Sequence, residues 1–141
     1  MENLSSNDFE DLRQQGFAAR RKASESVLKA LIIPDGWLAE AEYQQEFGGL
    51  PPIHLRFWPA HGRFFVSLCS PGTLSNEWKL IISSAGSQRI KLLRRYKVFN
   101  STQVSNVLIC ASRLDKQGYV FDGIVNGLLS NSFSDFLFPE K

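Results

Sequence analysis

Two short runs of alternating side chains, joined by a tight turn, constrain the fold of this chain more than any other feature. In residues 53–58, Ile, Leu and Phe alternate with His, Arg and Trp, and residues 64–69 alternate in a similar way. A period of two places alternate side chains on opposite faces of a strand. With Pro59-Ala60-His61-Gly62 as the turn and Pro71-Gly72 as the stop, the pattern predicts a β-hairpin.

Two further segments extend the predicted hairpin into a sheet. Residues 78–82 predict a third strand, and residues 89–98 predict a fourth with Ile90 and Leu92 on its buried side. Residues 84–87, Ser-Ala-Gly-Ser, form the loop between them. Since links this short usually join neighbouring antiparallel strands, the pattern favours an antiparallel meander.

Helical patterns flank this block on both sides. Asn7 predicts a capped helix start, and helical spacing continues past Gly16 until Pro34-Asp35-Gly36, either as two helices or as one bent helix. On the other side, Ser101 is the expected N-cap of a helix that Gly118 ends. A weaker final helix follows over residues 121–128.

The order of helices, strands and helices predicts an α+β fold. We expect one domain over residues 1–141, with an about four-stranded, mainly antiparallel sheet and helices from both ends of the chain packed on one face. Residues 1–7 and 133–141 are the expected flexible ends. The apolar segment Phe133 to Phe138 is expected to fold onto the core, with a docking segment or a dimer contact as the alternatives.

The residues that usually carry chemistry are few. His54 and His61 have no partner at a spacing that predicts a site, and Cys69 and Cys110 lie in apolar segments typical of buried free thiols. Zinc ligands normally occur as closely spaced pairs, which the sequence lacks. Gly48-Gly49 is followed by Leu-Pro-Pro rather than by a helix start, so it does not predict a phosphate site. We therefore expect no enzyme, cofactor or metal.

The lack of long apolar stretches and the free thiols indicate a cellular compartment. No apolar stretch approaches the roughly 18 residues of a membrane span, and no charged start followed by an apolar run opens the sequence. Free thiols indicate a reducing environment. A cytoplasmic protein is expected.

Charge is distributed unevenly along the chain. Residues 1–50 carry nine acidic and five basic side chains, whereas residues 51–100 carry eight basic side chains and one acidic. Such an asymmetry can mark a partner surface, although a solvated surface explains it equally well. The candidate partner-binding residues are the acidic Asp35, Glu40, Glu42 and Glu46 and the basic Arg89, Lys91, Arg95 and Lys97.

Each charged group has more than one interpretation. The four basic residues fall on one strand face at period two, which suits a solvated face, a protein partner or single-stranded nucleic acid. The four acidic residues could imitate DNA locally toward a DNA-binding protein. The net charge of +2 argues against a mimic made of the whole molecule.

Five short sequence words occur in a characteristic order and spacing. They are Pro34-Asp35-Gly36-Trp37, Glu46-Phe47-Gly48-Gly49, Pro59-Ala60-His61-Gly62-Arg63-Phe64, Leu68-Cys69-Ser70-Pro71-Gly72 and Asp115-Lys116-Gln117-Gly118-Tyr119. Together they resemble the plasmid SOS inhibition protein B (PsiB) family, most clearly over residues 34–125.

The resemblance implies a function that composition does not. It implies a plasmid-encoded protein that binds free RecA and blocks its nucleation on single-stranded DNA, which keeps the SOS response silent during conjugation. The resemblance leaves open whether single-strand DNA-binding protein is a further partner. A single-stranded nucleic acid binding module using the basic strand is the alternative, and direct nucleic acid binding is not what the resemblance implies.

Overall fold

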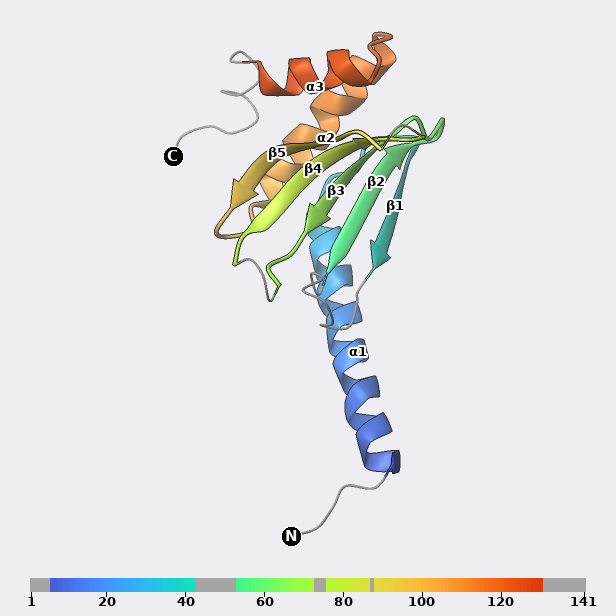
Figure 1. Ribbon diagram of the computed structural model, residues 1–141, viewed down its shortest axis with the longest axis vertical. Coiled ribbons are helices and arrows are strands. Elements are labelled where there is room, and N and C mark those ends of the chain that lie inside the picture. Colours follow the sequence, from blue (N-terminus) through green and yellow to red (C-terminus); the bar gives the residue numbers. More distant parts are fainter. Residues whose placement is uncertain (1–5, 43–52, 73–75, 87, 131–141) are drawn as a thin grey trace.

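The computed structural model describes residues 6–42, 53–72, 76–86 and 88–130, so Glu46, Gly48-Gly49 and the Phe133 to Phe138 segment lie outside the described residues (Figure 1). Three helices and five strands are present in the described part of the chain. In chain order they are α1 (Ser6–Ala30), β1 (Trp37–Glu42), β2 (His54–Pro59), β3 (Phe64–Cys69), β4 (Trp78–Ser84), β5 (Ile90–Tyr96), α2 (Ser101–Lys116) and α3 (Phe121–Leu129).

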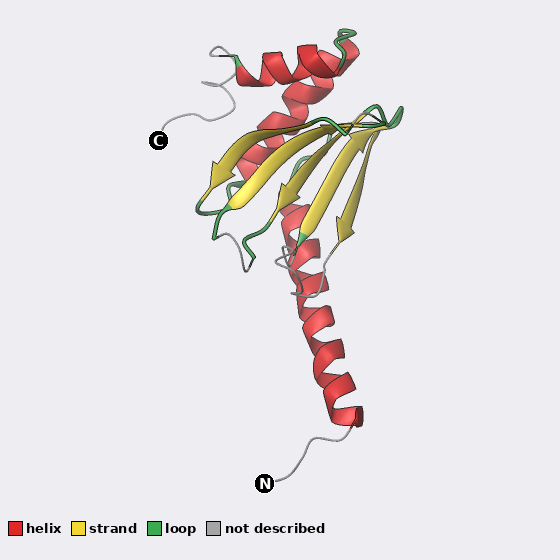
Figure 2. Ribbon diagram, viewed as in Figure 1, coloured by secondary structure: helices red, strands yellow, loops and turns green. Residues whose placement is uncertain are grey.

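The strands form one sheet in the order β1-β2-β3-β4-β5, and every neighbouring pair is antiparallel (Figure 2). The predicted α+β class, hairpin and meander are thereby confirmed. One strand was missed: β1, with the sequence Trp-Leu-Ala-Glu-Ala-Glu, pairs with β2 through its whole length. Alanine and glutamate are poor strand formers, so pairing with a neighbour rather than local propensity explains this strand.

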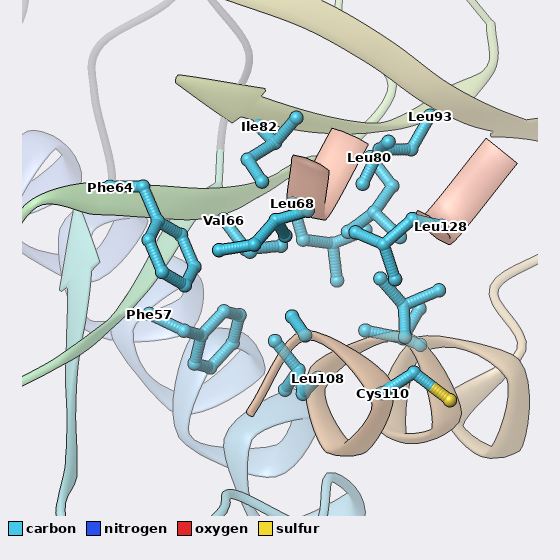
Figure 3. Close-up of a cluster of buried hydrophobic side chains, with 14 of the residues drawn as sticks. Phe57, Phe64, Val66, Leu68, Leu80, Ile82, Leu93, Leu108, Cys110 and Leu128 are labelled. Carbon is cyan, nitrogen blue, oxygen red and sulfur yellow. The ribbon is translucent and has the colours of Figure 1, made fainter. Parts of the chain in front are cut away.

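All three helices lie on one side of the sheet (Figure 1). The side chains of Leu55, Phe57 and Val66 point to that side and are fully buried. Leu80 and Leu108 join them in the cluster between the sheet and α2 (Figure 3). We call this side of the sheet the covered face. Burying a leucine or phenylalanine side chain stabilises the fold by about 1.5–3 kcal/mol, so this face provides the main driving force for folding.

The predicted helix ends lie close to the observed ones, but both starts are displaced, and α1 begins at Ser6, so the predicted cap Asn7 lies inside it. Gly118 adopts a φ of 93° after the last turn of α2, which confirms it as the helix stop. The N-cap of α2 is Asn100 rather than the predicted Ser101: the Asn100 side chain accepts a hydrogen bond from the Gln103 backbone N–H. Gly127 has a packing role, because a Cβ there would lie 2.7 Å from a Leu114 methyl of α2.

Helix α1 is continuous through Gly16, as the single-helix alternative predicted. Just after its C-terminal end it is attached to the core, where Leu31 is buried and the Ile32 backbone N–H donates to Ser105 Oγ of α2 at 2.9 Å. Ser24 of α1 is buried and donates a hydrogen bond to the Arg20 carbonyl. Within the described residues, no helix is long and apolar enough to cross a bilayer.

A β-bulge changes which side chains of β5 are buried. Leu80 pairs with Arg94 while Ile81 pairs with Leu92, so Leu93 is an extra residue in the strand. The bulge shifts the alternation and buries Leu93 and Tyr96. The prediction that Ile90 and Leu92 are buried was wrong: they are 66% and 37% exposed.

Candidate functional site

The side of the sheet opposite the helices, which we call the open face, is covered by no helix of the described chain (Figure 1). The strand register arranges its positions in three rows that cross all five strands. The first row is Leu38, Trp58, Phe65, Ser83 and Ile90; the second is Glu40, Arg56, Ser67, Ile81 and Leu92; the third is Glu42, His54, Cys69, Lys79 and Arg95.

An aromatic pair lies in the first row of the open face. The Trp58 and Phe65 ring centroids are 5.6 Å apart, and the Arg56 guanidinium carbon lies 5.6 Å from the Phe65 ring centroid. Leu38 at one end of the row and Ile90 at the other are 51% and 66% exposed. Partly exposed aromatic side chains, with exposed aliphatic side chains on the same face, are typical of interaction surfaces on soluble domains.

Charge changes sign across the open face. β1 supplies the exposed Glu40, β2 supplies Arg56 opposite it in the register, and Lys79 and Arg95 lie at the other end. Since β1 and β5 are the two edge strands, Glu40 and Arg95 lie at opposite edges of one sheet. Arg56 lies beside Glu40, however, and Glu77 Oε2 lies 3.9 Å from Arg95 Nε, so the separation of charge is local and does not extend to the two halves of the sequence.

The basic candidates do not form one row. Lys91 pairs with Ile82 and Arg95 pairs with Lys79, and because Ile82 and Lys79 point to opposite faces of β4, so do Lys91 and Arg95. Arg89 contacts the Asp122 carboxylate and lies over the Phe121 ring at 5.0 Å from its centroid. The predicted single basic face was wrong, because the bulge interrupts the period of two. Lys97 is exposed in the bend that follows the strand.

The acidic candidates cluster more closely. Asp35 is exposed in the turn that precedes β1, and Glu40 is exposed within β1. Glu42 occupies the register position opposite His54. Glu46 lies outside the described residues. The described members thus lie on or beside the β1 edge.

A cavity of about 240 Å³ lies where the β2–β3 turn meets the end of α2. His61 Nε2 lies 2.8 and 2.9 Å from the two carboxylate oxygens of Asp115, and the Arg63 backbone N–H donates to His61 Nδ1 at 3.0 Å. Because Nδ1 accepts this hydrogen bond, Nε2 carries the proton and donates it to Asp115. Both ring nitrogens are engaged, so the imidazole ties the hairpin to α2.

Sequence reasoning missed the His61–Asp115 contact because the two residues are 54 positions apart. The signal was present in another form. His61 belongs to one of the five sequence words and Asp115 to another, and Gly118 and Tyr119 of the latter also line the cavity. Two distant words thus meet in space at this cavity.

The thiols are poor nucleophiles. Burial raises the pKa of Cys69, and the nearby Lys79 and Arg56 offset this only in part. Burial likewise raises the pKa of Cys110. Thiols react as thiolates, so both are less reactive than an exposed cysteine at neutral pH. Among the described residues, no group of three His, Cys, Asp or Glu side chains could hold a metal ion.

Comparison with known families extends the similarity beyond the five words. A family model described as plasmid SOS inhibition protein (PsiB) matches residues 1–132. The match includes α1 and α3 as well as the sheet, so it covers every described element.

Proposed function

We propose, because this chain belongs to the plasmid SOS inhibition protein (PsiB) family, that it inhibits the SOS response by binding free RecA and blocking RecA nucleation on single-stranded DNA. The family match over residues 1–132 is the observation that carries the proposal. The proposed setting is the cytoplasm during conjugation. The protein acts in this proposal as a binding protein and not as an enzyme.

The described chemistry supports binding over catalysis. His61 is held at both nitrogens, and the two thiols are kept protonated by burial. A catalytic site needs a nucleophile together with a base and an orienting group. The exposed features of the described chain are instead surfaces of charge and apolar side chains, which suit protein recognition.

The β1 edge is the part of the molecule that best suits competition with DNA. Asp35 and Glu40 present exposed carboxylates at this edge. A basic surface that normally holds DNA phosphates would be attracted to them, and such attraction also speeds association. Sequestering RecA before it loads on DNA requires only that this contact forms in free solution.

The order of mixing tests this proposal. RecA ATP hydrolysis on single-stranded DNA should start more slowly when the protein is mixed with RecA before DNA is added than when it is added last. Asp35→Lys should weaken the inhibition, whereas Glu25→Lys, the same charge change at an exposed position of α1, should not. Equal absence of inhibition in both orders would sink the proposal.

A single-stranded nucleic acid binding module is the second candidate, favoured by the exposed cations Lys91 and Lys97 at the β5 edge. Such binding would weaken steeply with salt, because phosphate contacts release counterions. Fluorescence anisotropy with a bare oligonucleotide decides the matter. Micromolar or tighter binding that Lys91→Glu and Lys97→Glu together abolish would favour this candidate over RecA sequestration.

A further inference from the structure

We propose that the outer edge of β5 binds an extended, acidic segment of a partner protein, which adds to the sheet as a sixth strand. This inference does not rest on RecA binding. It rests on the backbone groups that β5 turns away from the sheet, on the charge of this strand, and on two exposed aliphatic side chains beside those groups.

The outer side of β5 is a strand edge. β5 is the last strand of the sheet, and among the described strands it pairs with β4 alone (Figure 2). The Ser84 backbone N–H donates to the Arg89 carbonyl at 2.9 Å, so these two residues form a hydrogen-bonded pair. Such pairs alternate along an antiparallel ladder, which makes Lys91 the next residue of β5 to bond to β4. The backbone N–H and C=O groups of Ile90 and Leu92 therefore point outward, where an added strand can reach them.

The strand and its two ends are basic. Residues 88–98 carry five basic side chains and no acidic one. The carboxylates of Asp122 and Glu77 each lie beside one of the five, so the edge keeps an excess of positive charge. Lys91 is exposed in the middle of the outward-facing segment. Since opposite charges on adjacent strands attract, this edge favours a strand with acidic side chains.

The same charge argues against a second copy of β5 as the occupant. Pairing two β5 edges would bring basic side chains close together, because residues 88–98 contain no acid to face them. Charged side chains on an edge strand discourage this kind of self-association. The β1 edge, where Glu40 is exposed, would instead repel an acidic strand. Charge thus distinguishes the two edges of the sheet.

The exposed aliphatic side chains favour a peptide over nucleic acid. Ile90 and Leu92 are 66% and 37% exposed, next to their own outward-facing backbone groups. Single-stranded nucleic acid is held by cations and stacking aromatic rings, whereas an added strand is held by main-chain hydrogen bonds and by contacts to alternate side chains. The order Ile90, Lys91, Leu92 therefore specifies the occupant: apolar side chains that alternate with acidic ones.

Fluorescence anisotropy with labelled synthetic peptides tests the site. The probe is Glu-Val-Glu-Val-Glu-Val, which can place valines beside the aliphatic side chains of β5 and a glutamate beside Lys91. One control peptide has lysine in place of every glutamate. The other keeps the sequence but has every amide N-methylated, which removes its N–H donors. The probe should bind at least roughly tenfold more tightly than either control, because both charge and backbone pairing are needed.

A charge reversal in the protein tests the same contact from the other side. Lys91→Glu should weaken binding of the probe by roughly fivefold, since it replaces attraction with repulsion. Lys29→Glu is the matched control, because it makes the same change of net charge at an exposed position in the last turn of α1. It should leave the dissociation constant unchanged. Circular dichroism checks that both variants are folded.

Amide hydrogen exchange followed by NMR locates the bound peptide. In the free protein the amides of Ile90 and Leu92 should exchange quickly, whereas the amide of Lys91, which bonds to β4, should exchange slowly. Adding the Glu-Val probe should slow the exchange of Ile90 and Leu92.

Three results would overturn the proposal. An N-methylated peptide that binds as tightly as the probe would show that charge alone holds it. Slow exchange of Ile90 and Leu92 in the free protein would show that the edge is already occupied. Truncation of residues 131–141 would then release the two amides if that segment is the occupant, and a mass that grows without limit above 15.9 kDa would indicate β1 of another copy. A bare oligonucleotide that binds more tightly than the probe, and needs Lys91, would assign the edge to nucleic acid.

Discussion

Phe57 and Trp58 are neighbours in β2, and they show how differently the two faces of the sheet are used. Phe57 points to the covered face and is fully buried, whereas Trp58 points to the open face and is half-buried. On the covered face the positions of the central strands are almost all apolar. On the open face apolar, polar and charged side chains are mixed.

The difference separates folding from recognition. Apolar burial is non-directional, so the covered face stabilises the fold without specifying a partner. The open face combines partly exposed aromatic side chains with charges, and charges can give a contact specificity for a partner. Substitutions on the two faces should therefore change different measurable quantities.

The largest effect is expected on the covered face. Phe57→Ala should lower the free energy of unfolding by about 3–5 kcal/mol, because it removes a buried ring and leaves a cavity. Trp58→Ala should cost only about 1 kcal/mol in dilute solution, since its ring is already in contact with water. Urea unfolding of both variants measures the contrast. Similar losses for the two would mean that the open face also belongs to the core.

An intermediate effect is expected at Tyr96, on the covered face at the edge strand β5. Burial raises the pKa of Tyr96 well above its ordinary value of 10.0, outweighing the opposing effect of Arg94. Above pH 10 the unfolded state therefore releases a proton that the folded state retains, so stability should fall as pH rises from there.

Tyr96→Phe should remove this part of the alkaline loss, which melting curves between neutral pH and pH 11 would measure. Tyr119→Phe, a change at an exposed tyrosine next to the cavity, is the control. An alkaline slope that is the same in Tyr96→Phe as in the wild type would contradict the burial of the Tyr96 hydroxyl on the covered face.

The smallest effect is expected at the rim where the two faces meet. His61→Ala should lower the free energy of unfolding by about 1 kcal/mol, the usual value of a partly exposed hydrogen-bonded pair. Asp115→Asn, which keeps an acceptor, should cost less. A double-mutant cycle between the two positions checks that the loss comes from their contact; no coupling energy would show that it does not.

Local patterns predicted the fold well where they were regular. The alternation in residues 53–69, the helix of residues 101–116 and its stop at Gly118 all agree with the structure. The strand of residues 37–42 could not be predicted, because its stability comes from pairing with β2. The bulge at Leu93 could not be predicted either, because register is a property of two paired strands and not of one.

The candidate site was harder to predict from the sequence for the same reason, because it also depends on how the strands pair. The candidate residues were chosen by charge, and the structure divides the basic ones between two faces of the sheet. The open face contains Trp58 and Phe65, which as isolated residues carry no signal of exposure. Trp58 and Phe65 become candidates only because they lie on the side of the sheet that the helices leave uncovered.

The most direct test of the account is the order in which the protein, RecA and DNA are mixed. RecA ATP hydrolysis on single-stranded DNA is measured with the protein added to RecA before DNA, and again with the protein added last. The account predicts a slower start of hydrolysis in the first order than in the second. Equal absence of inhibition in both orders would contradict it.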